Sequence, residues 1–421
     1  MAGRERYPEP IVITGLGLIT SVGRDRESVW QAVRQGTSGV RKLTGLDRIP
    51  DGLLLGAPVD ITPSVPGQLK CIDLAQHAAA EAVADAKIDF DAVDLERFAC
   101  ACSAHMADAS GIAELCGRPY PREENAINWW EQCLPNTSCA LLAKKYGLLG
   151  PRVAHSTACA SGLIDVLSAA RFIRDGQCDI ALAGSAEWIT PLFAAAFHNM
   201  RVLAYDDVPE RAARPFDRDR KGFVLGEGAA MFVLERLGHA RARGARIYAE
   251  IKAGKMLGEA HHVTGIDRDS DALTRLIGDT LRAADLSPAD VGYINAHGTG
   301  TEQNDIAEIR GIRRAFGAAA DDTCISSIKS MIGHLVNASG SVELALTALA
   351  MRDGFAPPTV NLDNPDPECD LDCVPLVGRI NRFQHALKLS VAFGGHLVAA
   401  ALSRWNDASS GFAYPTLRQA A

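Results

Sequence analysis

Short apolar runs of strand length alternate along the chain with longer segments in which apolar residues recur every three or four positions. The strand-like runs form two series, at 11–17, 98–103, 179–185 and 229–236, and then at 247–254, 291–298, 323–328 and 387–395. Helical spacing marks 74–86, 161–175, 271–284, 305–316 and 338–352. Continuous apolar strands separated by helices are typical of an α/β protein with a buried sheet.

The second series of strands and helices repeats the first. Glycines follow two predicted helices directly, Gly176 after 161–175 and Gly354 shortly after 338–352, where helices commonly end. No Gly/Ser-rich linker separates the two series. We therefore predict two similar halves, 1–246 and 247–421, fused into one body.

The composition fits a folded globular protein and excludes several classes. Of 421 residues, 47% are hydrophobic and 22% charged, and the net charge of -8 argues against a general nucleic-acid binder. No apolar run reaches the roughly 18 to 20 residues that cross a bilayer, so we expect no membrane span.

Acidic residues and a proline precede the apolar segment 11–20, which favours a strand over a signal peptide. The eleven cysteines lack CxxC spacing, as expected of reduced thiols in a cytoplasmic protein.

Cys159 has the local context of a nucleophile. The sequence TACASG at 157–162 lies where an extended run gives way to a helix, so we expect a tight turn at Cys159. A helix N-terminus favours the thiolate, which predicts a lowered pKa for Cys159, and the backbone amides there can hold an oxyanion. Taken alone, Cys159 is better interpreted as one more buried cysteine, the commonest fate of an isolated Cys.

Two histidine motifs offer the partners that a reactive thiol needs. His297 begins HGTGT directly after the apolar run 291–296, and His334 ends SIKSMIGH after another strand. Such loops at strand ends face clefts more often than cores, although a lone histidine is usually structural. A zinc site would require ligands from three distant loops, and neither HExxH nor a P-loop occurs, so we expect no metal and no nucleotide.

These motifs, with FGG at 393–395, resemble those of the β-ketoacyl-acyl-carrier-protein synthases, particularly the synthase II type. RPFDRDRKGFVLGEGA at 214–229 and NDIAE at 304–308 extend the resemblance over nearly the whole chain. The resemblance implies a thiolase fold with a five-layer αβαβα body, and a homodimer. It also implies an acyltransferase that condenses an acyl thioester with malonyl-acyl carrier protein, in fatty-acid or polyketide-type biosynthesis. The protein would need no cofactor of its own, because phosphopantetheine of the carrier bears the substrates.

The resemblance also implies roles for individual catalytic residues. Cys159 would carry the acyl group, and His297 and His334 would serve decarboxylation and condensation. Lys329 would order the site, and Glu343 would support it from the following helix.

Further residues would contact the substrate. The backbone amides of Cys159 and Phe393 would form an oxyanion hole. Phe393 would also gate the acyl pocket. Substrate-binding roles fall on Thr299, Thr301, Phe393, Gly394 and Gly395, with the two threonines meeting the phosphopantetheine arm.

The chain departs from the family pattern around the pocket and at its entrance. The segment LSVAFGGHL carries Val391, His396 and Leu397 where the family has Phe, Thr and Asn. His105 or Met106 could narrow the channel. The basic entrance is also thinned, because Lys70 is the only basic residue of its segment and Tyr205 is followed by two aspartates. These changes predict a specialised carrier or substrate.

Two other functions remain open. A coenzyme A-dependent thiolase shares the fold but typically uses a second cysteine where this chain has His334. A non-catalytic chain-length partner would lose the nucleophile, which this chain retains at Cys159. We therefore favour decarboxylative condensation. The alternative within this reaction type is a specialised secondary-metabolite ketosynthase with a dedicated carrier.

Overall fold

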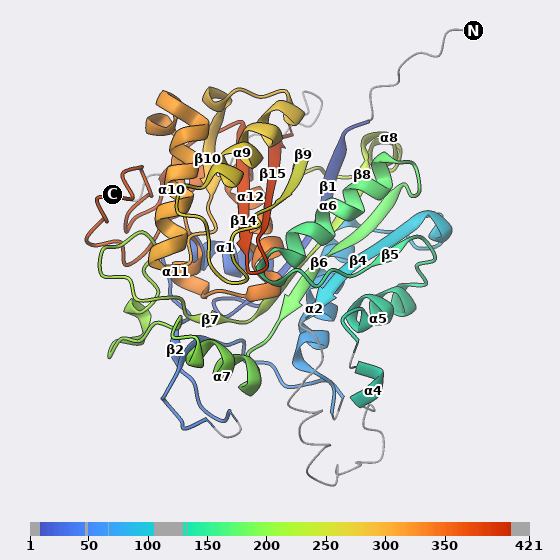
Figure 1. Ribbon diagram of the computed structural model, residues 1–421. Helices are drawn as coiled ribbons and strands as arrows, with labels where there is room; N and C mark the ends of the chain where they lie inside the picture. The colour runs from blue at the N-terminus through green and yellow to red at the C-terminus, as the bar shows by residue number, and fades with distance from the viewer. Residues whose placement is uncertain (1–8, 47–48, 66, 105–128, 133, 406–421) are drawn as a thin grey trace, which may run out of the picture.

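A single ten-stranded sheet runs through the computed structural model, which describes residues 9–46, 49–65, 67–104, 129–132 and 134–405 (Figure 1). In spatial order its strands are β11 (Cys324–Ser326), β10 (Val291–Asn295), β14 (His385–Ala392), β15 (His396–Arg404), β9 (Ala249–Gly258), β1 (Ile11–Thr20), β8 (Gly228–Arg236), β6 (Ile180–Glu187), β4 (Phe98–Ala104) and β5 (Arg152–Val153). Strands β1, β8, β6, β14 and β15 are buried along almost their whole length, which explains why these runs are apolar without alternation. The central strand β9 is buried only in part.

The sheet consists of two five-stranded parts with the same topology. The order β1-β8-β6-β4-β5 in one part matches β9-β15-β14-β10-β11 in the other, and the strand directions correspond. The two parts join where β1 pairs with β9 in antiparallel orientation. The predicted boundary at 246/247 lies between α8 (Leu237–Ala242) and β9, and it stays a prediction of where the two halves meet.

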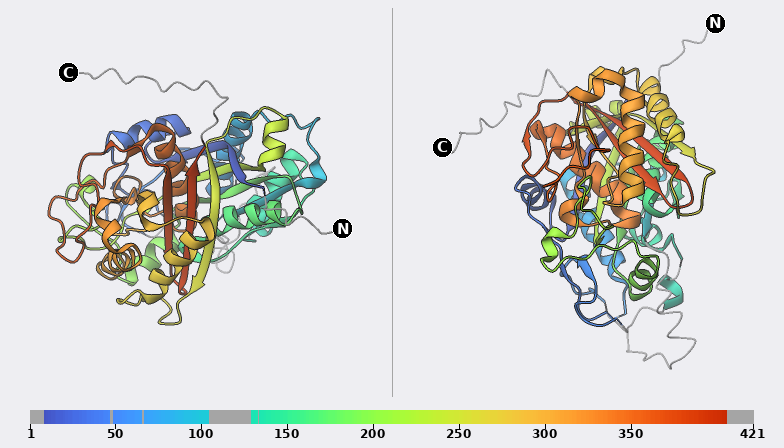
Figure 2. Two further views of the ribbon diagram at one scale, coloured as in Figure 1. Left: turned by 90° about the horizontal axis from the view of Figure 1, so that it is seen from above. Right: turned by 60° about the vertical axis from the view of Figure 1, so that its left-hand side comes forward.

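Helices cover both faces of each part and fill the space between them (Figures 1 and 2). The central helices α6 (Ser161–Arg174) and α12 (Ser339–Asp353) contact each other, with α6 on β6 and β4 and α12 on β14. On the outside, α2 (Lys70–Ala86) packs on β1 and β8, and α9 (Asp271–Ala284) packs on β9 and β15 beside α10 (Glu302–Phe316). The predicted five-layer αβαβα arrangement is confirmed.

Smaller elements complete the fold. The other helices of the described residues are α1 (Arg26–Arg34), α4 (Trp129–Gln132), α5 (Thr137–Tyr146), α7 (Pro191–Asn199) and α11 (Lys329–Ile332). Short 3-10 helices are η1 (Leu95–Arg97), η2 (Ala158–Ala160), η3 (Pro209–Arg211), η4 (Pro288–Asp290), η5 (Gly317–Asp322) and η6 (Val336–Ala338). Two small sheets contain β2 (Arg41–Lys42), β3 (Leu55–Ala57) and β7 (Leu225–Gly226), and β12 (Phe355–Ala356) and β13 (Arg379–Ile380).

Each predicted strand and helix corresponds to an element of the structure, with one clear error at 387–395. The helices α1, α5 and α7 were not predicted. The predicted strand 387–395 ends at Ala392, because Gly394 and Gly395 have positive φ angles of 86° and 74° and turn the chain into β15. The strand β15 was missed, since its apolar run HLVAAALSR was not separated from β14. Gly354 adopts the left-handed conformation expected at the end of α12.

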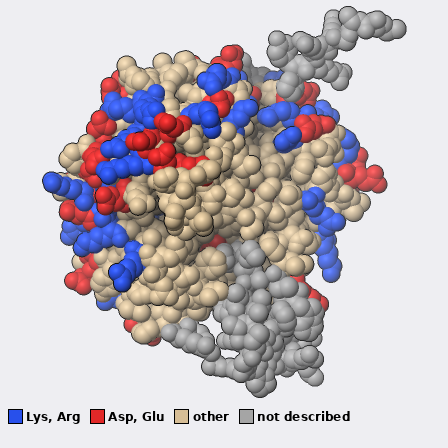
Figure 3. All heavy atoms as spheres, viewed as in Figure 1, with Lys and Arg blue, Asp and Glu red and all other residues tan. Residues whose placement is uncertain are grey.

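The surface carries both signs of charge. Figure 3 shows Lys and Arg beside Asp and Glu over the upper left of one face, around α9 and α10. There Arg310 pairs with Glu368, and Arg314 with Asp271. Within the described ranges, no helix is both long enough and apolar enough to cross a membrane.

Candidate active site

Cys159 lies on a tight turn that leads directly into the central helix α6. Ala158 has a φ of 47°, a conformation that non-glycine residues adopt rarely. The Ser161 hydroxyl fixes the turn, accepting from the Thr157 amide at 2.8 Å and donating to the Ala158 carbonyl at 2.8 Å. Gly162 is required at the start of α6, because a Cβ at this position would lie 2.1 Å from Ser185 Oγ.

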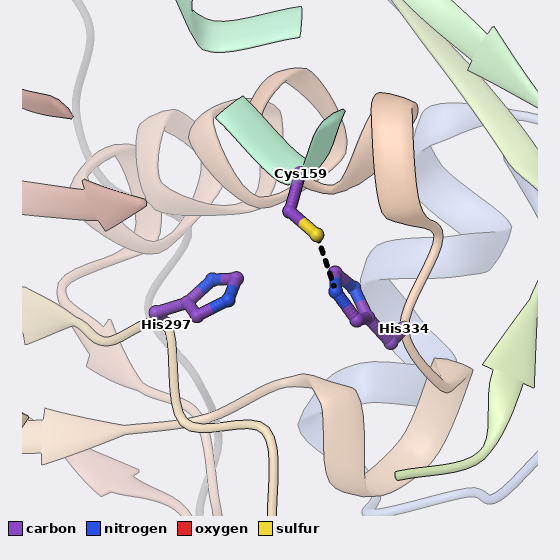
Figure 4. Close-up of side chains that lie close together, drawn as sticks. All are labelled: Cys159, His297 and His334. Carbon is purple, nitrogen blue, oxygen red and sulfur yellow. Dashed lines mark hydrogen bonds between the residues drawn. The ribbon is translucent and has the colours of Figure 1, made fainter. Parts of the chain in front are cut away.

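The two predicted histidines meet at this cysteine (Figure 4). His334 Nε2 lies 3.1 Å from Cys159 Sγ, and its Nδ1 lies 2.8 Å from the hydroxyl oxygen of Ser339. The His297 ring faces the same space, with ring centroids 5.3 Å apart between the two histidines. Three loops that are distant in sequence therefore converge on one point.

A buried ion pair stands behind His297. Lys329 Nζ lies 2.6 Å from Glu343 Oε1, donates to the His297 carbonyl at 2.5 Å and lies 3.4 Å from His297 Nδ1. An ammonium group can only donate, so His297 Nδ1 accepts and the ring proton lies on Nε2. The Nε2–H group is therefore the hydrogen-bond donor of this ring.

Two residues that support the site were missed from the sequence. Glu308 accepts hydrogen bonds from the His297 and Gly298 amides at 2.6 and 2.7 Å and so anchors the HGTGT loop. Lys388 on β14 also pairs with Glu343, at 2.6 Å from Oε2. The sequence held a signal for each residue. Glu308 belongs to the motif NDIAE, and Lys388 is a lone lysine in an otherwise apolar strand.

Both imidazoles are neutral at pH 7. Burial lowers the pKa of His297 and of His334 well below the usual value, and the nearby ammonium groups of Lys329 and Lys388 lower it further. A neutral imidazole can accept a proton from a thiol or donate one to an oxyanion, according to its tautomer.

The prediction of a lowered pKa for Cys159 is wrong. Burial raises the pKa of this thiol to about 12, although Lys329 and the backbone N–H groups of Cys159 and Phe393 act in the opposite direction. Desolvation of the anion outweighs the helix N-terminus because the thiol is buried. The resting group is a thiol, and its proton has an acceptor in His334.

This pKa predicts the pH dependence of alkylation. Between pH 7 and 9, below the pKa, the thiolate fraction rises about tenfold per pH unit, and the rate of iodoacetamide modification at Cys159 should rise with it. Peptide mass mapping of the Cys159 peptide over time measures this rate. A rate that levels off below pH 8 would mean that the thiol ionises much more easily than the enclosed site implies.

A cavity of about 600 Å³ opens onto the three residues. Apolar side chains line one part, among them Phe197, Met200, Phe223, Val391 and Phe393, and polar groups line another, among them His261, His262, Thr299, Thr301 and Glu302. The Thr299 and Thr301 hydroxyls lie 2.8 Å apart. Such a mixed lining suits an elongated ligand that has both amide and hydrocarbon segments.

Gly394 and Gly395 do not line this cavity in the described part of the chain. Instead, the Gly394 amide donates to the Val263 carbonyl at 2.7 Å, and the Glu259 amide donates to the Gly395 carbonyl at 2.8 Å. Their substrate-binding role stays a prediction, and their observed contacts hold the loop that carries His261 and His262.

The departures from the family pattern have different positions. Val391 lines the cavity, Leu397 packs in the hydrophobic core, and His396 lies against the turn at Gly394. Of the three, Val391 alone changes the described wall of the cavity. His105 and Met106 lie outside the described residues.

In the segment where the resemblance implies a basic entrance, Lys70 is not a free surface cation. Its Nζ lies 2.5 Å from Glu227 Oε2, and its side chain is only 17% exposed. Tyr205 is 47% exposed. Both positions fit the predicted loss of a basic rim.

Cys159, His297 and His334 also have the spacing of a metal site, with ligand atoms within 4.8 Å of one another. The sequence predicts that a metal site would need ligands from three distant loops, and the fold brings these loops together. A cation there would face the ammonium group of Lys329, 3.4 Å from His297 Nδ1, and this charge opposes metal binding. The absence of a metal stays a prediction.

Comparison with known proteins places these residues in a family context. The family model described as "Beta-ketoacyl synthase, N-terminal domain" matches residues 8–240, and "Beta-ketoacyl synthase, C-terminal domain" matches residues 248–363. The chain is 37% identical over 422 residues to the tetracenomycin polyketide synthase ketoacyl synthase alpha subunit of Streptomyces glaucescens, covering 95% of this chain and 98% of that protein. It is also 37% identical over 419 residues to 3-oxoacyl-acyl-carrier-protein synthase 2 of Coxiella burnetii, covering 94% and 99%.

A solved structure agrees with these relatives. It is described as a type II polyketide synthase acyl-carrier protein in complex with its ketosynthase bound to the hexaketide. It superposes with a TM-score of 0.87 at 32% identity, and the match covers 95% of this chain and 100% of that one.

Proposed function

The chain belongs to the β-ketoacyl synthase family, and on this premise we propose that Cys159, His297 and His334 carry out a decarboxylative condensation. An acyl thioester and malonyl-acyl carrier protein would give a 3-oxoacyl-acyl carrier protein and CO2. The observation that supports this most strongly is the contact of 3.1 Å between His334 Nε2 and Cys159 Sγ, with His297 facing the same cavity.

Acyl transfer to Cys159 is the first step. His334 Nε2 accepts the thiol proton as the sulfur attacks the acyl carbonyl, and the backbone N–H groups of Cys159 and Phe393 stabilise the oxyanion. The carbon–sulfur bond to the carrier then breaks. The carrier thiolate takes up the proton from His334 and leaves.

Decarboxylation and condensation follow. The bond between the malonyl carboxylate and its α-carbon breaks, CO2 leaves, and the electron pair forms an enolate whose oxygen accepts hydrogen bonds from His297 and His334. The enolate carbon attacks the acyl-Cys159 carbonyl, the bond to Cys159 Sγ breaks, and the released thiolate takes up a proton from solvent, which restores the thiol. Ser339 can donate to or accept from His334 Nδ1, so His334 can serve both steps in different tautomers.

The substrates would arrive on the phosphopantetheine of the carrier, with no cofactor of the protein's own. Thr299 and Thr301 line the cavity with free capacity to bond the amides of the arm, and Phe393 stands beside Cys159. Lys329 and Glu343 would hold His297 in its donor tautomer.

The choice of extender separates this function from the thiolase alternative. We expect malonyl-carrier to be consumed with one CO2 for each 3-oxoacyl product, because the enolate forms by decarboxylation. Incubation with acyl-carrier and either malonyl-carrier or acetyl-coenzyme A, with product and CO2 measured, tests this. Equal product from acetyl-coenzyme A without CO2 would overturn the proposal in favour of a thiolase.

We also propose that the partner is a dedicated carrier. Since Lys70 is neutralised by Glu227, attraction to a generic acidic fatty-acid carrier should be weak and only slightly dependent on salt. The measurement compares kcat/KM for that carrier and for a carrier of the same pathway, with the same acyl chain, at low and moderate salt.

We expect the dedicated carrier to have the higher kcat/KM. Equal values with a steep salt dependence would instead mean that exposed arginines such as Arg201 and Arg211 form the docking surface. The chain would then be an ordinary fatty-acid elongating synthase.

A dimer remains part of the proposal. In the described sheet β5 is an edge strand with no neighbour on its outer side, which leaves it free to pair across an interface. The Streptomyces relative is named an alpha subunit, so a heteromeric partner is the alternative to the predicted homodimer. The cytoplasmic location likewise stays a prediction.

A further inference from the structure

We infer that Lys388 is a positioning residue for decarboxylation, which fixes Glu343 and the loop of His297 from beneath the site. The inference rests on the proposed function and adds a residue that neither the sequence motifs nor the family resemblance assigned. It starts from the place of Lys388, a fully buried lysine on β14 in a run of otherwise uncharged residues.

The ammonium group of Lys388 is surrounded by oxygen atoms. It lies 2.6 Å from Glu343 Oε2, donates to the Ala296 carbonyl at 3.3 Å and also donates to the Leu389 carbonyl. A buried charge without partners would cost several kcal/mol, so these oxygens account for its presence in the core. Ala296 directly precedes His297.

Two lysines therefore share one carboxylate. Lys329 Nζ lies 2.6 Å from Oε1 of Glu343, and Lys388 Nζ lies 2.6 Å from Oε2. Glu343 cannot rotate without losing one of these contacts. The two ammonium groups also hold successive carbonyls of the loop, Lys388 that of Ala296 and Lys329 that of His297.

The arrangement also sets the charge behind the imidazoles. Two ammonium groups face one carboxylate in this triad, and the next carboxylate, Glu308, already accepts the amides of His297 and Gly298. The positive charge of Lys388 favours a developing enolate and disfavours protonation of His297 and His334. Lys388 thus acts on the reaction through Glu343, Lys329 and the loop, without contact to substrate.

The test replaces the lysine and separates the two half-reactions. Lys388→Met removes the charge at similar length, and Lys388→Gln keeps an amide donor without charge. Ser390→Ala is the matched control, because Ser390 is buried two residues along the same strand, on the same face, and its hydroxyl makes no hydrogen bond in the described ranges. Thermal unfolding, acylation of Cys159 by intact mass, and CO2 release from malonyl-carrier are measured for each from pH 5.5 to 8.

We expect both Lys388 variants to become acylated within a few-fold of the wild-type rate but to release CO2 about 10² times more slowly. The acid limb of their CO2 release should move to higher pH, because the imidazoles protonate more easily. Methylammonium chloride should partly restore CO2 release in Lys388→Met, and sodium chloride at equal ionic strength should not. Ser390→Ala should match the wild type.

Three results would overturn the inference. One is wild-type CO2 release and an unchanged pH profile in either folded variant. Another is an equal loss of acylation and CO2 release without rescue by the amine, which marks a purely structural lysine. The third is failure of both variants to fold, which would also assign Lys388 to stability alone. Absence of CO2 release by the wild-type protein is a different outcome, since it refutes the proposed function itself.

Discussion

Replacing Cys159 by alanine is expected to abolish both the acyl-enzyme and the condensation product. The expected loss is complete because, in the described chain, Cys159 is the thiol that meets His297 and His334 in the cavity. The loss of one sulfur atom at a buried turn held by Ser161 should leave the fold intact. Intact mass after incubation with acyl-carrier, and product formation after addition of malonyl-carrier, are the two measurements.

Cys178→Ala is the matched control, because Cys178 is also buried and lies outside the cavity. This variant should be acylated and should condense like the wild type. Normal product formation by Cys159→Ala would mean that another group carries the acyl chain and that the proposed mechanism is wrong.

Replacing His297 by alanine is expected to slow decarboxylation by a factor of about 10² or more, while Cys159 is still acylated. An oxyanion donor contributes about this much, and His297 makes no contact with the thiol comparable to that of His334. His334→Ala should lose decarboxylation to a similar extent and should also be acylated more slowly, since its Nε2 is the acceptor of the thiol proton. Acylation and CO2 release must therefore be followed separately.

His77→Ala, an exposed histidine on α2, serves as the control and should change neither rate. If His297→Ala decarboxylated malonyl-carrier at the wild-type rate, His297 would not be an oxyanion donor. If it lost acylation as well, its role would extend to the first step.

Periodicity and apolar runs were enough to predict an α/β protein of two similar halves, and the family resemblance implied its five layers. Buried strands and central helices are easy to recognise in the sequence because they are almost entirely apolar. Every residue of β6 is buried, and so are most residues of α12. The turn at Gly394 and Gly395 was predicted as strand, since its positive φ angles depend on the packing of the loop at Glu259. Glu259 is distant in the sequence, so the residues next to Gly394 and Gly395 give no sign of this packing.

The site was predictable as motifs but not as geometry or electrostatics. Cys159, His297 and His334 stand far apart in the chain, and only the folded sheet brings them within one cavity. The wrong direction for the Cys159 pKa has the same origin, because the helix N-terminus is visible in the sequence and the enclosure is not. Lys388 was overlooked since its partner Glu343 lies 45 residues earlier, on another element.

The central claim is that one thiol, Cys159, carries the acyl chain that malonyl-carrier then extends. Its most direct test is time-resolved intact mass spectrometry of the protein loaded with acyl-carrier and then mixed with malonyl-carrier. We expect a single acyl adduct on Cys159 that disappears at the same rate at which CO2 and 3-oxoacyl-carrier appear, in equal amounts. An adduct that persists while product accumulates, or product without any adduct on Cys159, would contradict the account.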